Sequence, residues 1–165
     1  MDEIIKIVRL PPFRVVSFHV KDSKIPEEEA WTKLEAWAKP KGMFDDPAKH
    51  QIFGFNNPIP MGESELRGYE FWITIPDNFP VKDATVKRYP GGIYAVTTCR
   101  SVNNIGTAWS KLYEWLKSGE TFKLAYPEDY DFENGPALEL EHHLNPRVMD
   151  VNEIVLDCYM PICEK

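Results

Sequence analysis

The strongest constraint on the fold of this chain is an eight-residue phrase that occurs twice. Residues 30–37 read AWTKLEAW and residues 108–115 read AWSKLYEW, with five of the eight positions identical and a sixth exchanging Thr for Ser. In each copy Ala, Trp, Leu and Trp fall at i, i+1, i+4 and i+7, which is one face of a helix. Because the copies lie about half a chain apart, we expect a duplicated fold with a seam where the halves meet.

The segments around the first copy predict one helix and three strands. FRVVSFHV, over residues 13–20, is rich in β-branched and aromatic residues and predicts a strand. Pro26 and the three glutamates after it suit the first turn of a helix that runs to about Ala38. Short strands follow over residues 51–57 and 69–75. Gly54, inside the first of these, indicates a bulge or a close backbone approach.

The segments around the second copy repeat this order. A strand over residues 84–100 is interrupted by a bend at residues 90–92. A helix follows to Lys117, and then strands over residues 137–144 and 153–162. The chain therefore predicts an α+β fold within a single domain, residues 1–165. Two β-α-β-β halves, about 11–76 and 84–162, form a curved, mainly antiparallel sheet with both helices on one face. The other face, or the groove between the halves, is open for a ligand.

Charge and composition exclude several classes of protein. The 165 residues carry a net charge of −7 without a basic run, so no direct nucleic-acid partner is expected. No stretch approaches the roughly 20 apolar residues of a membrane helix, and the acidic start MDE lacks the features of a signal peptide. Three cysteines cannot form a complete disulfide framework, which suggests reduced thiols and a cytoplasmic protein.

The histidines and glycines predict neither a metal site nor a cofactor. His142 and His143 are adjacent, so on a strand they point to opposite faces, and His19 and His50 lack partners at a ligating distance in sequence. Residues 90–92 lack the lysine and the helix start of a phosphate loop.

Two glutamates on predicted strands are the leading candidates for chemistry. Glu141 shares one strand face with Glu139 and His143, and Glu70 shares another with Trp72. A poorly hydrated carboxylate among aromatic rings attracts a delocalised cation. The pair Glu70 and Glu141 could also act as acid and base if burial separated their pKa values. The alternative for each is an ordinary solvated glutamate.

Aromatic residues are candidates for the walls of the same site. Of the four helix tryptophans, we expect Trp109 to contact a ligand, although helix-on-sheet packing is the alternative role for all four. Tyr94 could supply stacking or a hydroxyl, and Tyr126 lies in an acidic loop over residues 120–136 that could act as a lid. When the halves are aligned, Phe53 becomes the counterpart of Glu141, Phe55 of His143, and Trp72 of Asp157. These mismatches would give the duplicated groove its polarity.

Taken together, four segments resemble the GyrI-like family, the effector-binding domain of multidrug-sensing and AraC-type regulators, which also occurs free-standing. They are PGGIYAV (90–96), AWSKLYEWL followed by Ser118 and Gly119, LEHHLNP (140–146) and IVLDCYMPI (154–162). The resemblance implies that Glu141 is the pocket carboxylate that pairs with cationic aromatic ligands. His143 stands where the family has Tyr, and TTCRS stands where the family strand continues to His-x-Gly.

The resemblance leaves three functions open. The first is a free-standing binding module for cationic or amphipathic aromatic compounds, which sequesters them or informs a separate protein partner. In it, the ligand contacts are Glu141, Glu70, Trp72, Trp109, Tyr94, Phe53, Tyr126 and His143. The second is a hydrolase of cyclopropane-bearing cytotoxins that uses Glu70 or Glu141. The third is inhibition of a protein such as gyrase.

Overall fold

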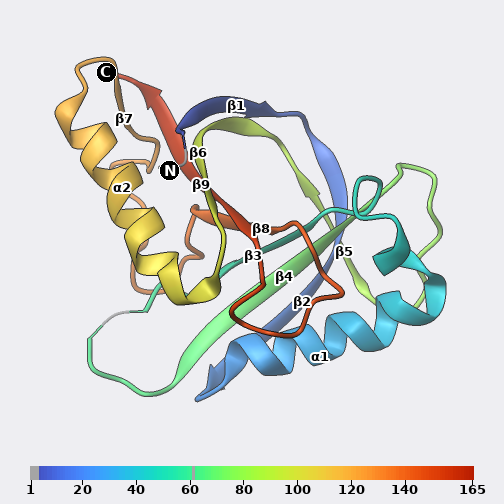
Figure 1. Cartoon of the computed structure of the whole chain (residues 1–165). Coiled ribbons are helices and arrows are strands. Elements are labelled where there is room, and N and C mark those ends of the chain that lie inside the picture. The colour runs from blue at the N-terminus through green and yellow to red at the C-terminus, as the bar shows by residue number, and fades with distance from the viewer. Residues whose placement is uncertain (1–3, 61) are drawn as a thin grey trace.

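The computed structural model describes residues 4–60 and 62–165 of the chain, and Met1–Glu3 of the acidic start and Met61 lie outside this part. Within these described residues, two α-helices pack on one curled, antiparallel, nine-stranded sheet (Figure 1). The predicted α+β class is confirmed. Both halves show the predicted β-α-β-β order. The first half consists of β2 (Phe13–Ser23), α1 (Pro26–Ala38), β3 (Ile52–Asn56) and β4 (Arg67–Ile75). The second half consists of β6 (Gly92–Cys99), α2 (Ile105–Ser118), β8 (Leu140–His143) and β9 (Leu156–Glu164).

Each half also begins with a strand that pairs with the other half. The strand β1 (Lys6–Leu10) pairs with β6, and β5 (Thr85–Tyr89) pairs with β2. The sheet order is β1-β6-β9-β8-β3-β4-β2-β5, so the halves meet at β3 and β8. The strand β1, whose residues are largely exposed, was not predicted from the sequence.

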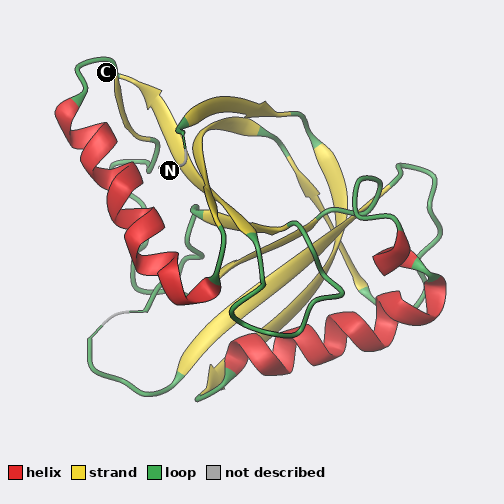
Figure 2. Ribbon diagram, in the orientation of Figure 1, coloured by secondary structure: helices red, strands yellow, loops and turns green. Residues whose placement is uncertain are grey.

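The exchange of first strands curls the sheet. The β1–β6 and β2–β5 ladders share one continuous register, because the numbers of two paired residues have the same sum in both. The segment from β1 to β2 therefore pairs with the segment from β5 to β6 as one two-stranded ribbon. The predicted bend at residues 90–92 lies in this ribbon. Gly91 has a φ of +87°, and a Cβ there would approach the carbonyl oxygen of Leu10 to 2.5 Å. Figure 2 shows the resulting partial barrel, with both helices on its outer face.

The repeated phrase provides the packing of both helices. Leu34 of α1 and Leu112 of α2 are each 0% exposed, and each is part of a separate apolar core between its helix and the sheet. The last Trp of each phrase packs on apolar residues beyond the helix, Trp37 on Phe18 and Trp115 on Phe122. Phe122 belongs to β7 (Phe122–Leu124), a three-residue strand on β9 within the segment predicted as a loop.

The face away from the helices lies inside the curl and is largely filled. A third core of aromatic and aliphatic residues occupies it, made of Leu10, Phe53, Phe55, Tyr94, Val96, Leu140 and Tyr159, with Val8, Phe13, Trp72 and Tyr89 against it. The expectation of an open opposite face is therefore correct only at one end of the barrel, where a cavity remains.

The alignment of the halves needs one correction. Phe53 faces the interior and is 0% exposed, whereas Glu141 pairs with Gly54 and faces outward. Successive strand residues point to opposite faces, so Phe53 and Glu141 are not equivalent. The proposed equivalence of Phe55 and His143 is wrong for the same reason, because the alignment is shifted by one residue. Trp72 and Asp157 do share the interior face.

Candidate ligand-binding site

The predicted site residues separate onto the two faces of the sheet. Glu141 of β8 pairs with Gly54 of β3, and Glu70 of β4 pairs with the next residue, Phe55. Because neighbouring positions on a strand alternate in direction, the Glu141 side chain points outward and the Glu70 side chain points into the barrel. The two carboxylates therefore cannot act on one substrate as an acid and base.

An outer groove lies beside α2, at the seam between the halves. It is a cavity of about 450 Å³ lined by α2, the end of β3, and the segment before β8. Two acids and a set of aromatic rings line it: Glu139, Glu141, Trp109, Tyr113, Tyr126 and Phe132. The structure thus brings together three predicted site residues, Glu141, Trp109 and Tyr126.

Glu141 is held by neutral donors. The Tyr69 hydroxyl donates to it at 2.7 Å and the Trp109 indole N–H at 3.3 Å. Burial raises the pKa of Glu141, the two hydrogen bonds lower it in part, and the negative charge of Glu27 raises it again, with a net increase. Glu141 is therefore a carboxylate whose ionisation the folded protein resists.

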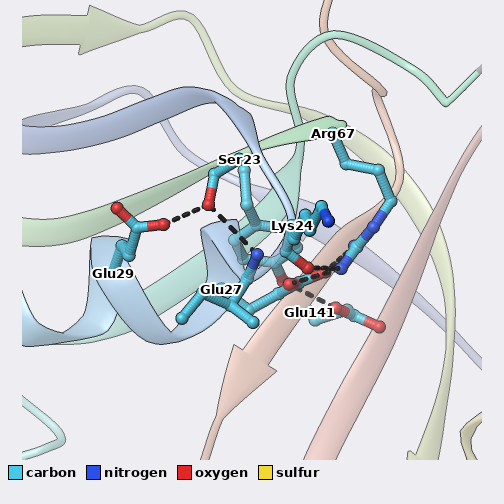
Figure 3. Close-up of polar contacts among 8 residues, drawn as sticks. Ser23, Lys24, Glu27, Glu29, Arg67 and Glu141 are labelled. Carbon is cyan, nitrogen blue, oxygen red and sulfur yellow. Dashed lines mark hydrogen bonds and ion pairs between the residues drawn. The ribbon is translucent and has the colours of Figure 1, made fainter. Parts of the chain in front are cut away.

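The basic side chain near Glu141 is already paired. Arg67 of β4 forms a two-point ion pair with Glu27 of α1 and donates to the Lys24 carbonyl at 3.2 Å. Figure 3 shows this cluster with Glu141 beside it. Among residues 4–60 and 62–165, no lysine or arginine forms an ion pair with Glu141, so its charge is uncompensated when it ionises.

Glu139 is a second carboxylate in the groove, and its hydrogen-bond donors are also neutral side chains. It accepts hydrogen bonds from the hydroxyls of Tyr113 at 3.0 Å and Tyr126 at 2.5 Å. Burial and the nearby Glu139 raise the pKa of Tyr113 to about 12, so this hydroxyl stays protonated at neutral pH. The Tyr126 hydroxyl also accepts a 2.6 Å hydrogen bond from the Leu138 N–H, which fixes the segment that leads into β8.

Among the acidic and aromatic residues named for the groove, three were not predicted as ligand contacts. Glu139 was placed on the same strand face as Glu141 but was not selected, and Phe132 lies in the loop that contains Tyr126. Tyr113 had a clear signal, because the repeat has Glu35 at the matching position. A surface glutamate replaced by Tyr in one copy indicates a role specific to that half.

His143 lies in a neighbouring hollow rather than in the groove. Its ring is 5.3 Å from that of Trp31 and 5.4 Å from that of Phe71. Burial and the adjacent His142 lower the pKa of His143 to about 3, so it is neutral. This hollow, of about 360 Å³, also includes Glu27.

Glu70 is satisfied inside the barrel. It accepts hydrogen bonds from Ser17 and Trp72 at 2.6 Å and from Asn57 at 2.7 Å, and Lys87 forms an ion pair with it at 2.7 Å. Burial raises the pKa of Glu70, but these four partners outweigh burial and lower it overall. A carboxylate with a lysine already bound offers little to a cationic ligand.

The other predicted ligand contacts on the interior face of the sheet differ in whether they line a cavity. Trp72 and Tyr94 line the barrel cavity with Glu70. Phe53 is in the core, stacked between Phe13 at 5.6 Å and His142 at 4.7 Å, and it lines none of the cavities described here.

No cluster of three or more His, Cys, Asp or Glu suited to a metal ion occurs in the described part of the chain. The predictions of no metal and no cofactor remain predictions. Within the same residues, no helix combines the length and the apolar character needed to cross a membrane.

The match to a family model gives the class of this protein, which is an effector-binding domain. The chain belongs to the Cass2 family of integron-associated effector binding proteins, whose family model matches residues 6–162. The predicted resemblance to GyrI-like effector-binding domains is thereby confirmed. No curated protein matches the chain.

Solved structures agree with this fold. The EcmrR C-terminal domain is 15% identical, with a TM-score of 0.64 and full coverage of both chains. The chain spans 59% of the EcmrR chain in a DNA complex. SAV2435 bound to tetraphenylphosphonium is 10% identical, with a TM-score of 0.56 and coverage of 97% of this chain and 94% of that one. A hydrolase from Listeria innocua is 8% identical, with a TM-score of 0.64 and coverage of 96% and 91%.

Proposed function

We propose that this protein binds amphipathic aromatic cations in the outer groove, with Glu141 as the electrostatic anchor. The observation that carries the proposal is the state of Glu141. It is a partly buried carboxylate, held by the O–H of Tyr69 and the N–H of Trp109, with no cationic partner in the described chain. A ligand cation would complete the pair.

The walls of the groove favour a delocalised cation over a metal ion or an ammonium group. Spreading the charge over aromatic rings weakens hydration, so such a ligand loses little on leaving water. The faces of Trp109, Tyr113 and Phe132 can then contact its rings, with an added cation–π attraction of about 0.5–2 kcal/mol. Glu139 supplies a second negative charge in the same groove.

The ligand of a structural relative supports this ligand class. SAV2435 was solved with tetraphenylphosphonium, a bulky aromatic monocation. Within a family of effector-binding proteins, binding of this kind serves either to sequester a toxic compound or to signal its presence to a separate regulator.

The test is calorimetric titration with tetraphenylphosphonium, with uncharged triphenylphosphine oxide as the matched ligand. We expect the Glu141→Gln substitution to weaken binding of the cation at least about tenfold, or 1.4 kcal/mol, and to leave the neutral ligand unchanged. Glu114→Gln, on the exposed side of α2, removes the same charge outside the groove and is the control. Equal cation affinity in Glu141→Gln and wild type would refute the anchor.

The alternative of a hydrolase now depends on Glu139 and Glu141, because these two carboxylates share the groove and Glu70 does not. Incubating a cyclopropane-bearing alkylator with the same three proteins distinguishes binding from turnover. Product that forms with wild type and Glu114→Gln but not with Glu141→Gln would establish catalysis.

A further inference from the structure

The mouth of the barrel holds a second cavity, separate from the outer groove. It has a volume of about 500 Å³ and lies on the opposite face of the sheet from Glu141. The rings of Trp72 and Tyr89, 5.4 Å apart, line its wall, and so does Tyr94 of β6, the strand that follows β5 in the chain. Phe55 and Ala137 line both cavities and form the partition between them.

The polar groups of this cavity differ from those of the groove. The Glu70 carboxylate is neutralised by Lys87 and fully hydrogen-bonded, so the cavity has no uncompensated negative charge. In contrast, no hydrogen bond is made by the hydroxyls of Tyr89 and Tyr94 to any residue of the described chain. Burial raises the pKa of Tyr89 to about 12, so it remains a donor at neutral pH.

The two free hydroxyls lie close to the same glycine. A Cβ built on Gly92 would lie 3.4 Å from the Tyr89 oxygen and 3.6 Å from the Tyr94 oxygen. Both phenol O–H groups therefore lie beside a residue that has no side chain. A carbonyl oxygen has two lone pairs and can accept both hydrogen bonds.

From this geometry we propose that the barrel mouth is a second ligand site, specific for uncharged, flat aromatic compounds that carry a carbonyl oxygen. The rings of the ligand lie against Trp72 and Tyr89, and its carbonyl oxygen accepts from Tyr89 and Tyr94 over Gly92. A cation is disfavoured here because Lys87 already occupies Glu70. The site is independent of the outer groove, so this proposal does not depend on cation binding there.

The probe is Nile red, a neutral fused-ring dye with one carbonyl, whose fluorescence reports transfer from water to an apolar site. We expect saturable binding to wild type. The conservative double substitution Tyr89→Phe with Tyr94→Phe removes only the two donors and should weaken binding about tenfold. Ala125→Trp, which fills this cavity without lining the groove, should abolish it. Thermal melts verify that each variant folds.

Two further measurements distinguish this site from the groove. Saturating tetraphenylphosphonium should not displace Nile red, and Glu141→Gln should bind Nile red as wild type does. Displacement by the cation would overturn the proposal, as would the absence of Nile red binding or affinity unchanged in both the double Phe variant and Ala125→Trp. Loss of cation binding in Glu141→Gln tests the groove alone and is read from the calorimetry.

Discussion

The hydroxyl of Tyr69 reaches Glu141 by passing over the bare backbone of Gly54. Tyr69 is on β4, Gly54 on β3 and Glu141 on β8, and the hydrogen bond measures 2.7 Å. A Cβ at Gly54 would lie only 2.5 Å from that hydroxyl oxygen. The two halves of the duplication are therefore joined at the proposed anchor by a contact that requires glycine between them.

Gly54→Ala should disrupt this contact. The new methyl group would also come within 2.8 Å of the Phe71 ring, so Tyr69 must move and Glu141 loses its strongest donor. We expect a destabilisation of about 1–3 kcal/mol and roughly tenfold weaker binding of tetraphenylphosphonium, measured by denaturant unfolding and calorimetry.

Gly106→Ala is the control for this substitution. Gly106 is in the first turn of α2, and a Cβ at this position would have no atom within 4 Å. Ala there should leave stability unchanged or raise it by up to about 1 kcal/mol. Wild-type affinity in Gly54→Ala would contradict the role of Tyr69 as the support of Glu141.

Glu141→Gln should stabilise the ligand-free protein at alkaline pH. Because folding raises the pKa of Glu141, its contribution to stability is complete below the unfolded pKa of about 4.3 and is lost as pH rises through the folded pKa. Gln cannot ionise and avoids that loss. We expect the variant to melt at least about 2 °C higher than wild type at pH 8, with the difference shrinking toward pH 4.

A bound cation should reverse this order of melting temperatures, so that wild type melts above Glu141→Gln. Tetraphenylphosphonium at about 100 times its dissociation constant should stabilise wild type by about 2.7 kcal/mol and the variant far less. If the variant melts below wild type at pH 8 without ligand, ionised Glu141 is not a source of instability.

The duplication was predictable because its cause is local. Each copy of the repeated phrase contains a buried Leu, Leu34 or Leu112, at the helical spacing that covers a sheet, and the strong strands around it are long and apolar. The strands β1 and β7 were missed because they are short and form only through partners far along the chain. Pairing with a distant part of the chain leaves little trace in a short segment.

The site was predictable in part for the same reason. Alternation along a strand placed Glu139, Glu141 and His143 on one face, but it could not say which face lies under the helices. In β4 the apolar residues Tyr69 and Phe71 face the helix side, whereas in β8 the apolar Leu140 faces the barrel and Glu141 faces the seam. The register of β3 with β4 and with β8 is what shows that Glu70 and Glu141 lie on opposite faces of the sheet.

Glu139→Gln should alter the preference of the groove for ligand charge. Glu139 lies just before β8 and Glu141 lies within it, two residues or about 7 Å apart along an extended chain, and both line the groove. A dication such as methyl viologen can engage both, whereas tetraphenylphosphonium needs one. We expect the substitution to weaken methyl viologen at least about tenfold and tetraphenylphosphonium less than about threefold, by calorimetry.

Tyr113→Phe is the matched variant, since it removes a donor to Glu139 but keeps the charge. It should leave the ratio of the two affinities nearly as in wild type. Equal losses for both ligands in Glu139→Gln would show that Glu139 shapes the groove and does not select charge.

Lys87→Met should destabilise the protein in a manner that depends on pH. The Glu70 side chain is 1% exposed, and that of Lys87 is 44% exposed. Without Lys87 the carboxylate keeps only the neutral donors Ser17, Asn57 and Trp72, so we expect a loss of about 1–3 kcal/mol at pH 7, by urea unfolding. The exposed Lys33→Met should change stability by less than about 0.5 kcal/mol.

The sign of the pH effect follows from Glu70. Its pKa is lowered in the folded protein, so its contribution to stability is present above the unfolded pKa of about 4.3 and is lost as pH falls through the folded pKa. The penalty of Lys87→Met should therefore shrink in acid, where a protonated Glu70 no longer needs a cation. A penalty of the same size in acid and at pH 7 would assign the loss to the packing of the lysine stem and not to its charge.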